Sequence, residues 1–143
     1  MRVESAGMPA PVDLIKQVPL FDEIEGRELE RLANSFKERR FDEGDHIAEE
    51  GESGIGFFVI GEGEAAITVR GDQVHTLKPG DYFGEIALID VGARTATVTA
   101  ATPITAYGLT AWDFRPFVEA NASVAWKLLQ HLAKLFRELQ EKS

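Results

Sequence analysis

The sequence contains no cysteine and has few basic residues for its acidic content. Without cysteine, the chain cannot form a disulfide framework, a thiolate nucleophile or a thiolate metal site. Its 15 lysines and arginines stand against 24 acidic residues, which gives a formal net charge of −9. A strongly acidic surface repels phosphate backbones and anionic headgroups. We therefore expect no direct contact with nucleic acid and no docking on membranes.

Long apolar runs are also missing, so nothing in the sequence predicts a segment that spans a bilayer. The N-terminus does not resemble a signal peptide, because no charged region is followed by an apolar core. We expect a cytoplasmic protein. With 44% hydrophobic residues, 143 residues suffice for one domain with one core. Residues 1–12 mix small residues with proline, so we expect a flexible tail there and a single domain over 13–143.

Helical patterns lie at both ends of this domain. In residues 26–37, one face of an amphipathic helix is formed by Leu29, Leu32, Ala33 and Phe36. Thr110 and Asp113 are spaced as a capping box for a short helix. Asn121 is the expected cap of a final helix that runs to about residue 141. This helix carries a seam spaced 3-4-3-4: Ala125, Leu128, Leu132, Leu135 and Leu139.

Between the helices, short apolar runs alternate with glycine and aspartate breaks roughly every 8–12 residues, which is typical of all-β folds. Residues 57–60 predict a buried strand. Residues 66–69 and 73–77 flank Gly71-Asp72 and predict a hairpin. Residues 95–100 alternate small apolar residues with threonines. The sequence thus predicts a mainly β fold, a jelly-roll-like antiparallel β-roll with N-terminal helices and a long C-terminal helix.

The segment 83–100 has the composition of an anion site. Gly84 allows close approach of backbone to a ligand. Arg94 is the only cation between Lys78 and Arg115, and its guanidinium matches two phosphate oxygens.

The residues around this glycine and arginine add further donors and acceptors. A helical turn after Gly84 would direct the N–H groups of Ile86 and Ala87 at an anion. Glu85 is suited to accept a hydrogen bond from a ribose hydroxyl, and Thr95 adds a hydroxyl beside the phosphate. On chemistry alone, a structural ion pair between Glu85 and Arg94 is the alternative.

This segment resembles the phosphate-binding cassette of the cyclic-nucleotide-binding family. That family includes catabolite activator proteins, regulatory subunits of cAMP-dependent kinase and cyclic-nucleotide-gated channels. The resemblance rests on Phe83 to Leu88 and on Arg94-Thr95-Ala96. A second family motif covers residues 47–63, with its Gly-Glu pair at Gly51-Glu52 and apolar residues at 57–60.

The resemblance implies a role for each matching residue. Arg94 would hold the exocyclic phosphate oxygens together with backbone N–H groups of Ala87 and Ala96. Glu85 would accept from the ribose 2′-hydroxyl, and Phe83 would wall the sugar. The ligand would be cAMP, or cGMP because Thr95 carries a hydroxyl. The remaining implied ligand-binding positions are Ile67 and Val74 beside the base, Gly84, Ile86, and Gln140 on a C-terminal lid helix.

The chain departs from the family pattern at Ala93, where proline usually precedes the arginine. Proline would preset the loop backbone, so its absence loosens the loop. At the lid, Leu135 and Leu139 stand where some relatives have polar base contacts, and Gln140 is the nearest polar candidate.

Other interpretations lead to different functions. The histidines lack the spacing of metal ligands, and no nucleophile–base pair is evident, so we expect neither a metal site nor an enzyme. The leucine seam fits a lid or a homodimer through residues 122–141. The competing functions are a ligand-free dimerisation or interaction domain of the same fold, and the sensor half of a transcription regulator.

Overall fold

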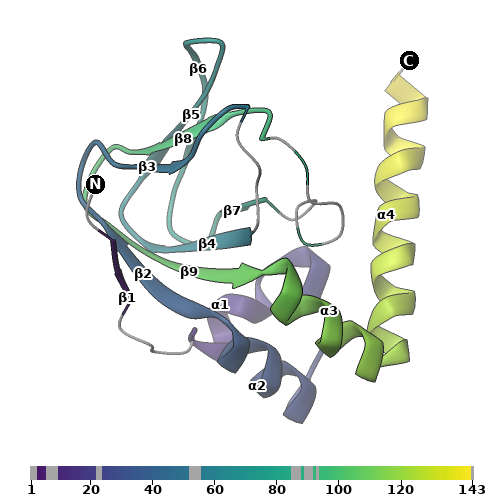
Figure 1. The fold of residues 1–143 in the computed structure, drawn as a ribbon. Coiled ribbons are helices and arrows are strands. Elements are labelled where there is room, and N and C mark those ends of the chain that lie inside the picture. The colour runs from purple at the N-terminus through teal and green to yellow at the C-terminus, as the bar shows by residue number, and fades with distance from the viewer. Residues whose placement is uncertain are drawn as a thin grey trace.

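The computed structural model describes residues 3–5, 10–21, 24–51, 56–84, 88, 92 and 94–142. The strands form two antiparallel sheets, one of five strands in the order β1-β2-β9-β4-β7 and one of four in the order β3-β8-β5-β6. Figure 1 shows the smaller sheet facing the larger one. The strands are β1 (Val3–Ser5), β2 (Lys37–Phe41), β3 (His46–Ala48), β4 (Gly56–Glu62), β5 (Ala65–Val69), β6 (Asp72–Leu77), β7 (Tyr82–Phe83), β8 (Thr97–Ala100) and β9 (Ile104–Thr110).

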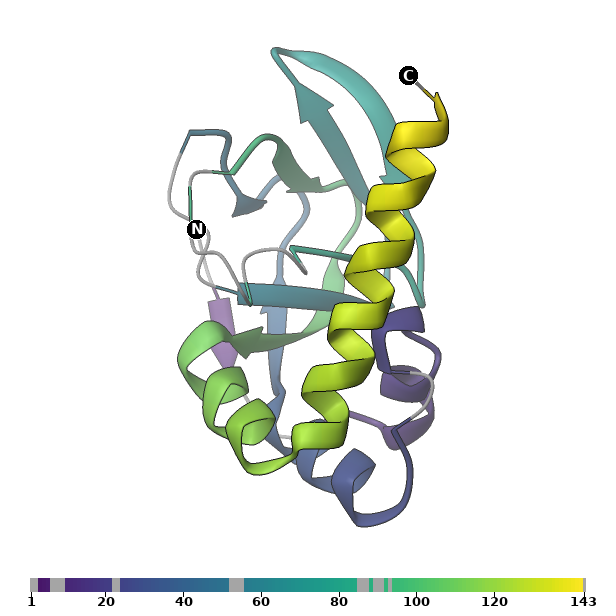
Figure 2. The same cartoon turned by 90° about the vertical axis from the view of Figure 1, so that its right-hand side faces the viewer.

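Helices from both ends of the chain gather on the outer side of the five-stranded sheet (Figure 1). They are α1 (Val12–Lys16), the 3₁₀ turn η1 (Pro19–Phe21), α2 (Gly26–Ser35), α3 (Ala111–Ala120) and α4 (Ala122–Lys142). In Figure 2, α4 rises from this helical layer toward the end of the molecule where the β5–β6 hairpin projects. The fold is therefore mainly β with flanking helices, as the sequence predicts.

The centre of the larger sheet is buried on both faces, because β4 separates two hydrophobic cores. Phe57 and Val59 face the helices, whereas Ile60 faces the interior of the roll. The helix-side core consists of Ala10, Ile15, Val18, Leu20, Phe21, Ile24, Leu29, Leu32, Ala33, Phe36, Phe57, Val59, Leu88, Leu109, Phe114, Val124 and Leu128. The roll-interior core consists of Phe41, Ile60, Ala65, Leu77, Val98, Ala100, Ile104 and Ala106.

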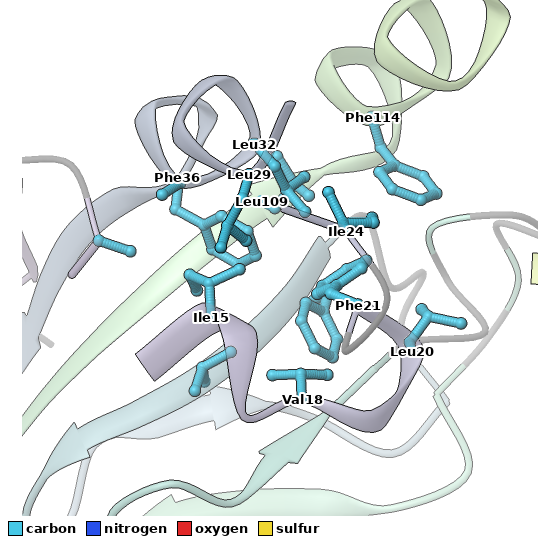
Figure 3. Packing of buried hydrophobic residues seen from close by; sticks show 14 of the residues in the cluster. Ile15, Val18, Leu20, Phe21, Ile24, Leu29, Leu32, Phe36, Leu109 and Phe114 are labelled. Carbon is cyan, nitrogen blue, oxygen red and sulfur yellow. The ribbon is translucent and has the colours of Figure 1, made fainter. Parts of the chain in front are cut away.

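Aromatic rings join the helices to the sheet (Figure 3). Phe21 is fully buried and makes edge contacts with Phe36 and Phe57, at ring-centroid distances of 6.4 and 5.9 Å. Phe114 of α3 lies 6.2 Å from the same ring. Edge-to-face aromatic pairs stabilise a core beyond the area that they bury. The predicted face of α2 is confirmed, since Leu29, Leu32, Ala33 and Phe36 all belong to this core.

The predicted hairpin forms, but its turn lies one residue earlier than Gly71-Asp72. Val69 pairs with Asp72, so the loop is Arg70-Gly71. Both residues have positive φ, 53° and 84°, as a type I′ turn requires. Farther along β6, Ile67 pairs with His75 while Thr68 pairs with Gln73, which leaves Val74 as the extra residue of a bulge.

Two local expectations differ from the structure. Residues 1–12 were expected to form a flexible tail, yet Val3–Ser5 pair with Phe41–Arg39 as β1, and α1 begins at Val12. Ladder pairing with β2 satisfies this backbone, and short polar segments give no sequence signal for such a partner. Asn121 stands directly before α4, as predicted, and its carbonyl accepts from the N–H groups of Val124 and Ala125. Its side chain, however, donates to the Phe117 carbonyl at the end of α3, at 2.7 Å.

The predicted cap of α3 is present, because the Thr110 hydroxyl accepts from the Asp113 N–H at 3.3 Å. Replacing Thr110 by valine keeps the shape and removes the acceptor. We expect Thr110→Val to lower the free energy of unfolding by about 1 kcal/mol, measured by urea denaturation. Thr110→Ser restores the hydroxyl and should recover most of this loss. Equal stability of the valine variant and the wild type would contradict the capping role.

Candidate functional site

Arg94 lies half-buried at the start of β4, although it is far from that strand in the sequence. Its Nη2 donates to the carbonyl oxygen of Gly56 at 2.5 Å. Its guanidinium carbon lies 5.9 Å from the centre of the Phe83 ring, within range of a cation–π contact. Burial removes water from the guanidinium and lowers the pKa of Arg94 from its usual value. A positive charge is thus held in a partly desolvated position.

Glycine is required at position 84 for two independent reasons. Its φ is +88°, a conformation that side chains disfavour. A Cβ atom built there would lie 2.5 Å from Arg94 Nη1 and 2.6 Å from the Gly56 carbonyl oxygen. The guanidinium therefore occupies the space that a side chain at position 84 would need. The predicted close approach of a ligand to Gly84 stays a prediction.

The ring of Phe83 is supported from below by a second aromatic ring. Phe58 stacks on it with centroids 5.4 Å apart and an interplanar angle of 22°. Phe58 itself lies over Gly108, where a Cβ atom would come within 2.8 Å of the ring. Strands β4 and β7 thus place two stacked rings beside Arg94, and Gly108 of β9 leaves the space that Phe58 needs.

The structure brings some predicted site residues together and leaves others apart. Phe83, Gly84 and Arg94 form one cluster, and Thr95 and Ala96 follow directly into β8. Glu85, Ile86, Ala87 and Ala93 lie outside the described residues, and so does the Glu85–Arg94 ion-pair alternative. The rest are on three other elements: Ile67, half-buried on β5; Val74, 60% exposed on β6; and Gln140, exposed on α4.

Leu88 connects the cassette segment to the C-terminal helices. It is buried in the helix-side core, which also contains Phe114, Val124 and Leu128. It lines a groove of about 620 Å³ between α3 and α4, together with Phe114 and Leu128. A shift of the backbone at Leu88 would therefore change the packing of these two helices directly.

The seam of α4 is divided along its length. Leu128 of the seam is buried, as is Val124 one turn earlier, whereas Leu132, Leu135 and Leu139 are increasingly exposed, at 37%, 39% and 68%. Figure 1 agrees, since the C-terminal half of α4 stands apart from the strands. In this structure only the first turns of α4 are anchored in a core.

Several residues contribute to the site through contacts that the sequence did not indicate. Gly56 contributes through its carbonyl, and Phe58 reads as an ordinary core residue within an apolar run. Glu50 and Gly51 contact the segment after Arg94: the Gly51 N–H donates to the Arg94 carbonyl at 2.8 Å, and the Glu50 N–H donates to the Thr97 hydroxyl at 3.0 Å. Backbone contacts of this kind depend on the fold and leave no residue pattern.

The part of the chain that the structure describes lacks the features of two other kinds of site. Within it, no three histidine or carboxylate side chains are grouped as metal ligands would be. None of its helices combines the length and apolar character that crossing a membrane requires.

The family model for the cyclic nucleotide-binding domain matches residues 38–121, more than half of the chain, and the chain belongs to this family. The match includes Phe83, Gly84 and Arg94. The predicted membership is thereby confirmed.

Individual relatives agree with this assignment. The chain is 39% identical over 92 residues to a cAMP-dependent protein kinase regulatory subunit of Yarrowia lipolytica, covering 63% of this chain and 24% of that protein. It is 40% identical over 85 residues to a cGMP-dependent protein kinase of Plasmodium berghei, covering 59% of this chain and 10% of that protein. The matched part therefore spans about a quarter of these relatives' length or less.

Among solved structures, the N-terminal domain of a transcriptional regulator from Streptomyces coelicolor A3(2) is similar over nearly its whole length. The TM-score is 0.84 with 28% sequence identity, and the match covers 90% of this chain and 96% of that one. The fold is thus shared with a domain that belongs to a regulator.

The fit between Gly84 and Arg94 predicts an effect of adding one methyl group. Gly84→Ala should lower the free energy of unfolding more than Gly44→Ala, a matched control whose φ is +90° and whose Cβ would meet nothing within 4 Å. The control isolates the conformational cost of roughly 1–2 kcal/mol. We expect the clash to add at least about 1 kcal/mol in urea denaturation. Equal losses would mean that the guanidinium moves aside freely.

Proposed function

We propose that this domain is a cyclic nucleotide sensor without catalytic chemistry. It binds cAMP, or cGMP, through Arg94 and the surrounding cassette, and it signals through α4 to an effector. The observation that carries the proposal is the half-buried Arg94 guanidinium against Gly84, in a chain of this family.

The chemistry of Arg94 suits a cyclic phosphate. A guanidinium has five N–H donors in a planar fork, and Gly56 accepts from one of its nitrogens. An anion at this position would restore the electrostatic solvation that burial removes from the charge. Phe83, under the guanidinium, is suited to wall the sugar. A ligand-free interaction domain would have no use for a desolvated cation.

The other contacts are proposed on the family pattern. Glu85 accepts from the ribose 2′-hydroxyl, and the N–H groups of Ile86, Ala87 and Ala96 complete the phosphate grip. Ile67 and Val74 face the base from the β5–β6 hairpin, and Gln140 approaches it from α4. In support, the hairpin and the C-terminal end of α4 project toward the same end of the molecule in Figures 1 and 2. Thr95 leaves both nucleotides open, since its hydroxyl suits the phosphate and the amino group of guanine.

The signal would leave through the exposed half of α4. Its seam is available for closure over the roll or for pairing with a second copy, and both uses would bury Leu132, Leu135 and Leu139. Ligand binding and self-association would then be coupled reciprocally. The proposal includes a cytoplasmic location. It leaves two alternatives for the effector: the domain is the sensor half of a transcription regulator, or it signals within another assembly.

Removing the guanidinium tests the binding function. Arg94→Ala should weaken cAMP and cGMP binding by at least roughly 2–3 kcal/mol, because a bidentate charge-assisted contact is lost. Arg94→Lys should also bind more weakly, because a point charge cannot contact two oxygens in parallel. Isothermal titration calorimetry measures both, with Arg31→Ala on the exposed face of α2 as the control. Wild-type affinity in Arg94→Ala would refute the proposed function.

Hydrogen exchange tests the signalling part. Saturating cAMP should slow amide exchange in α4 more than in the central strand β4, because the exposed half of the helix gains a partner. Sedimentation velocity on the same samples separates closure from pairing, since only pairing changes the mass. Unchanged exchange over residues 129–142 would mean that the signal leaves by another surface.

A further inference from the structure

Glu50 ties the tip of the β5–β6 hairpin to the strand that follows Arg94. One oxygen of its carboxylate accepts from the Arg70 N–H at 3.0 Å. Its own backbone N–H donates to the Thr97 hydroxyl at 3.0 Å, and the next residue, Gly51, donates to the Arg94 carbonyl at 2.8 Å. Two consecutive residues thus connect the hairpin tip with both ends of segment 94–97.

The hairpin tip needs such an anchor. The ladder between β5 and β8 ends where Thr68 pairs with Thr97, so Val69 to Asp72 extend beyond it. In a two-residue loop the N–H of Arg70 has no ladder partner. Arg70 also has φ +53°, which is uncommon for a residue with a side chain. The Glu50 carboxylate is the acceptor that stabilises this N–H in its strained conformation.

We propose that Glu50 is a positioning residue that fixes the hairpin tip relative to Arg94. This inference rests on the proposed function. In that function, Glu50 sets the distance between the phosphate side of the nucleotide site and the base side, where Ile67 and Val74 lie. Without the anchor, the hairpin adopts its binding-competent position for less of the time. The apparent affinity falls by that fraction, and only for ligands that carry a base.

Electrostatics alone predicts a change in affinity of the opposite sign. Glu50 is a negative charge in the same loop region as an anionic ligand, so its removal should slightly strengthen binding. A loss of affinity on removal is therefore evidence for positioning. Glu49 provides the matched control, because it is the adjacent residue, has the same charge and is exposed.

The experiment measures two probes on the full chain: cAMP, and methyl riboside 3′,5′-cyclic phosphate, which has sugar and phosphate but no base. Glu50→Ala should lower the affinity for cAMP about three- to tenfold, as expected for one lost hydrogen bond. It should change the affinity for the base-free probe by less than about twofold. Glu50→Gln keeps an acceptor oxygen and should bind cAMP like wild type. Amide exchange at residues 69–72 should rise in Glu50→Ala alone.

Other results would overturn the positioning role. These are wild-type cAMP affinity in Glu50→Ala, equal losses for both probes, the same loss in Glu50→Gln, or the same loss in Glu49→Ala. If the wild type binds neither cAMP nor cGMP, the proposed function fails and the positioning role fails with it. If the wild type binds cAMP and Glu50→Ala binds it equally well, only the positioning role fails and the proposed function stands. The two failures are therefore distinguishable.

Discussion

Strand β4 is buried on both faces, and both hydrophobic cores are built around it. A strand buried on both sides needs apolar partners above and below it. The helices supply one side, where Phe21 and Phe36 contact Phe57 and Phe114 contacts Phe21. The roll supplies the other side, where Phe58 meets Phe83. The same strand begins with the carbonyl that receives Arg94, so the strand that organises both cores also places the site.

Partial burial of Arg94 has an energetic consequence for this site. Removing water from a guanidinium is unfavourable, and the lowered pKa reports this cost. A carbonyl dipole and an aromatic face offset part of it, since a guanidinium is more weakly hydrated than an ammonium group. A phosphate, with full negative charge, would offset more. An anion bound here, as we propose, would therefore stabilise a buried charge that the protein alone holds at an energetic cost.

Local patterns in the sequence predicted the helices and strands well. The features that they did not predict depend on pairing between distant segments. The face of α2, the cap at Thr110 and the alternation in β8 follow from residue spacing, because each depends on neighbours in the chain. Phe83, Gly84 and Arg94 were identified by motif. The partner of Val3–Ser5, the bulge at Val74 and the acceptor role of Glu50 arise from pairing between distant segments. No spacing rule in a single sequence records such pairing.

The divided seam of α4 determines what a signal can do. Val124 and Leu128 bury the first turns in the helix-side core, and Leu88 of the cassette lies in that core too. A ligand can shift an equilibrium only by its different affinity for the two states, so the states must differ where the cassette makes contact. In the proposed signalling mechanism, Leu88 would provide that contact. Only the exposed half of α4 would need to move, because its anchored half would pass on the change while it stays in the core. Little chain would then be reorganised, which keeps the free-energy difference between the two states within the range that one bound nucleotide can overcome.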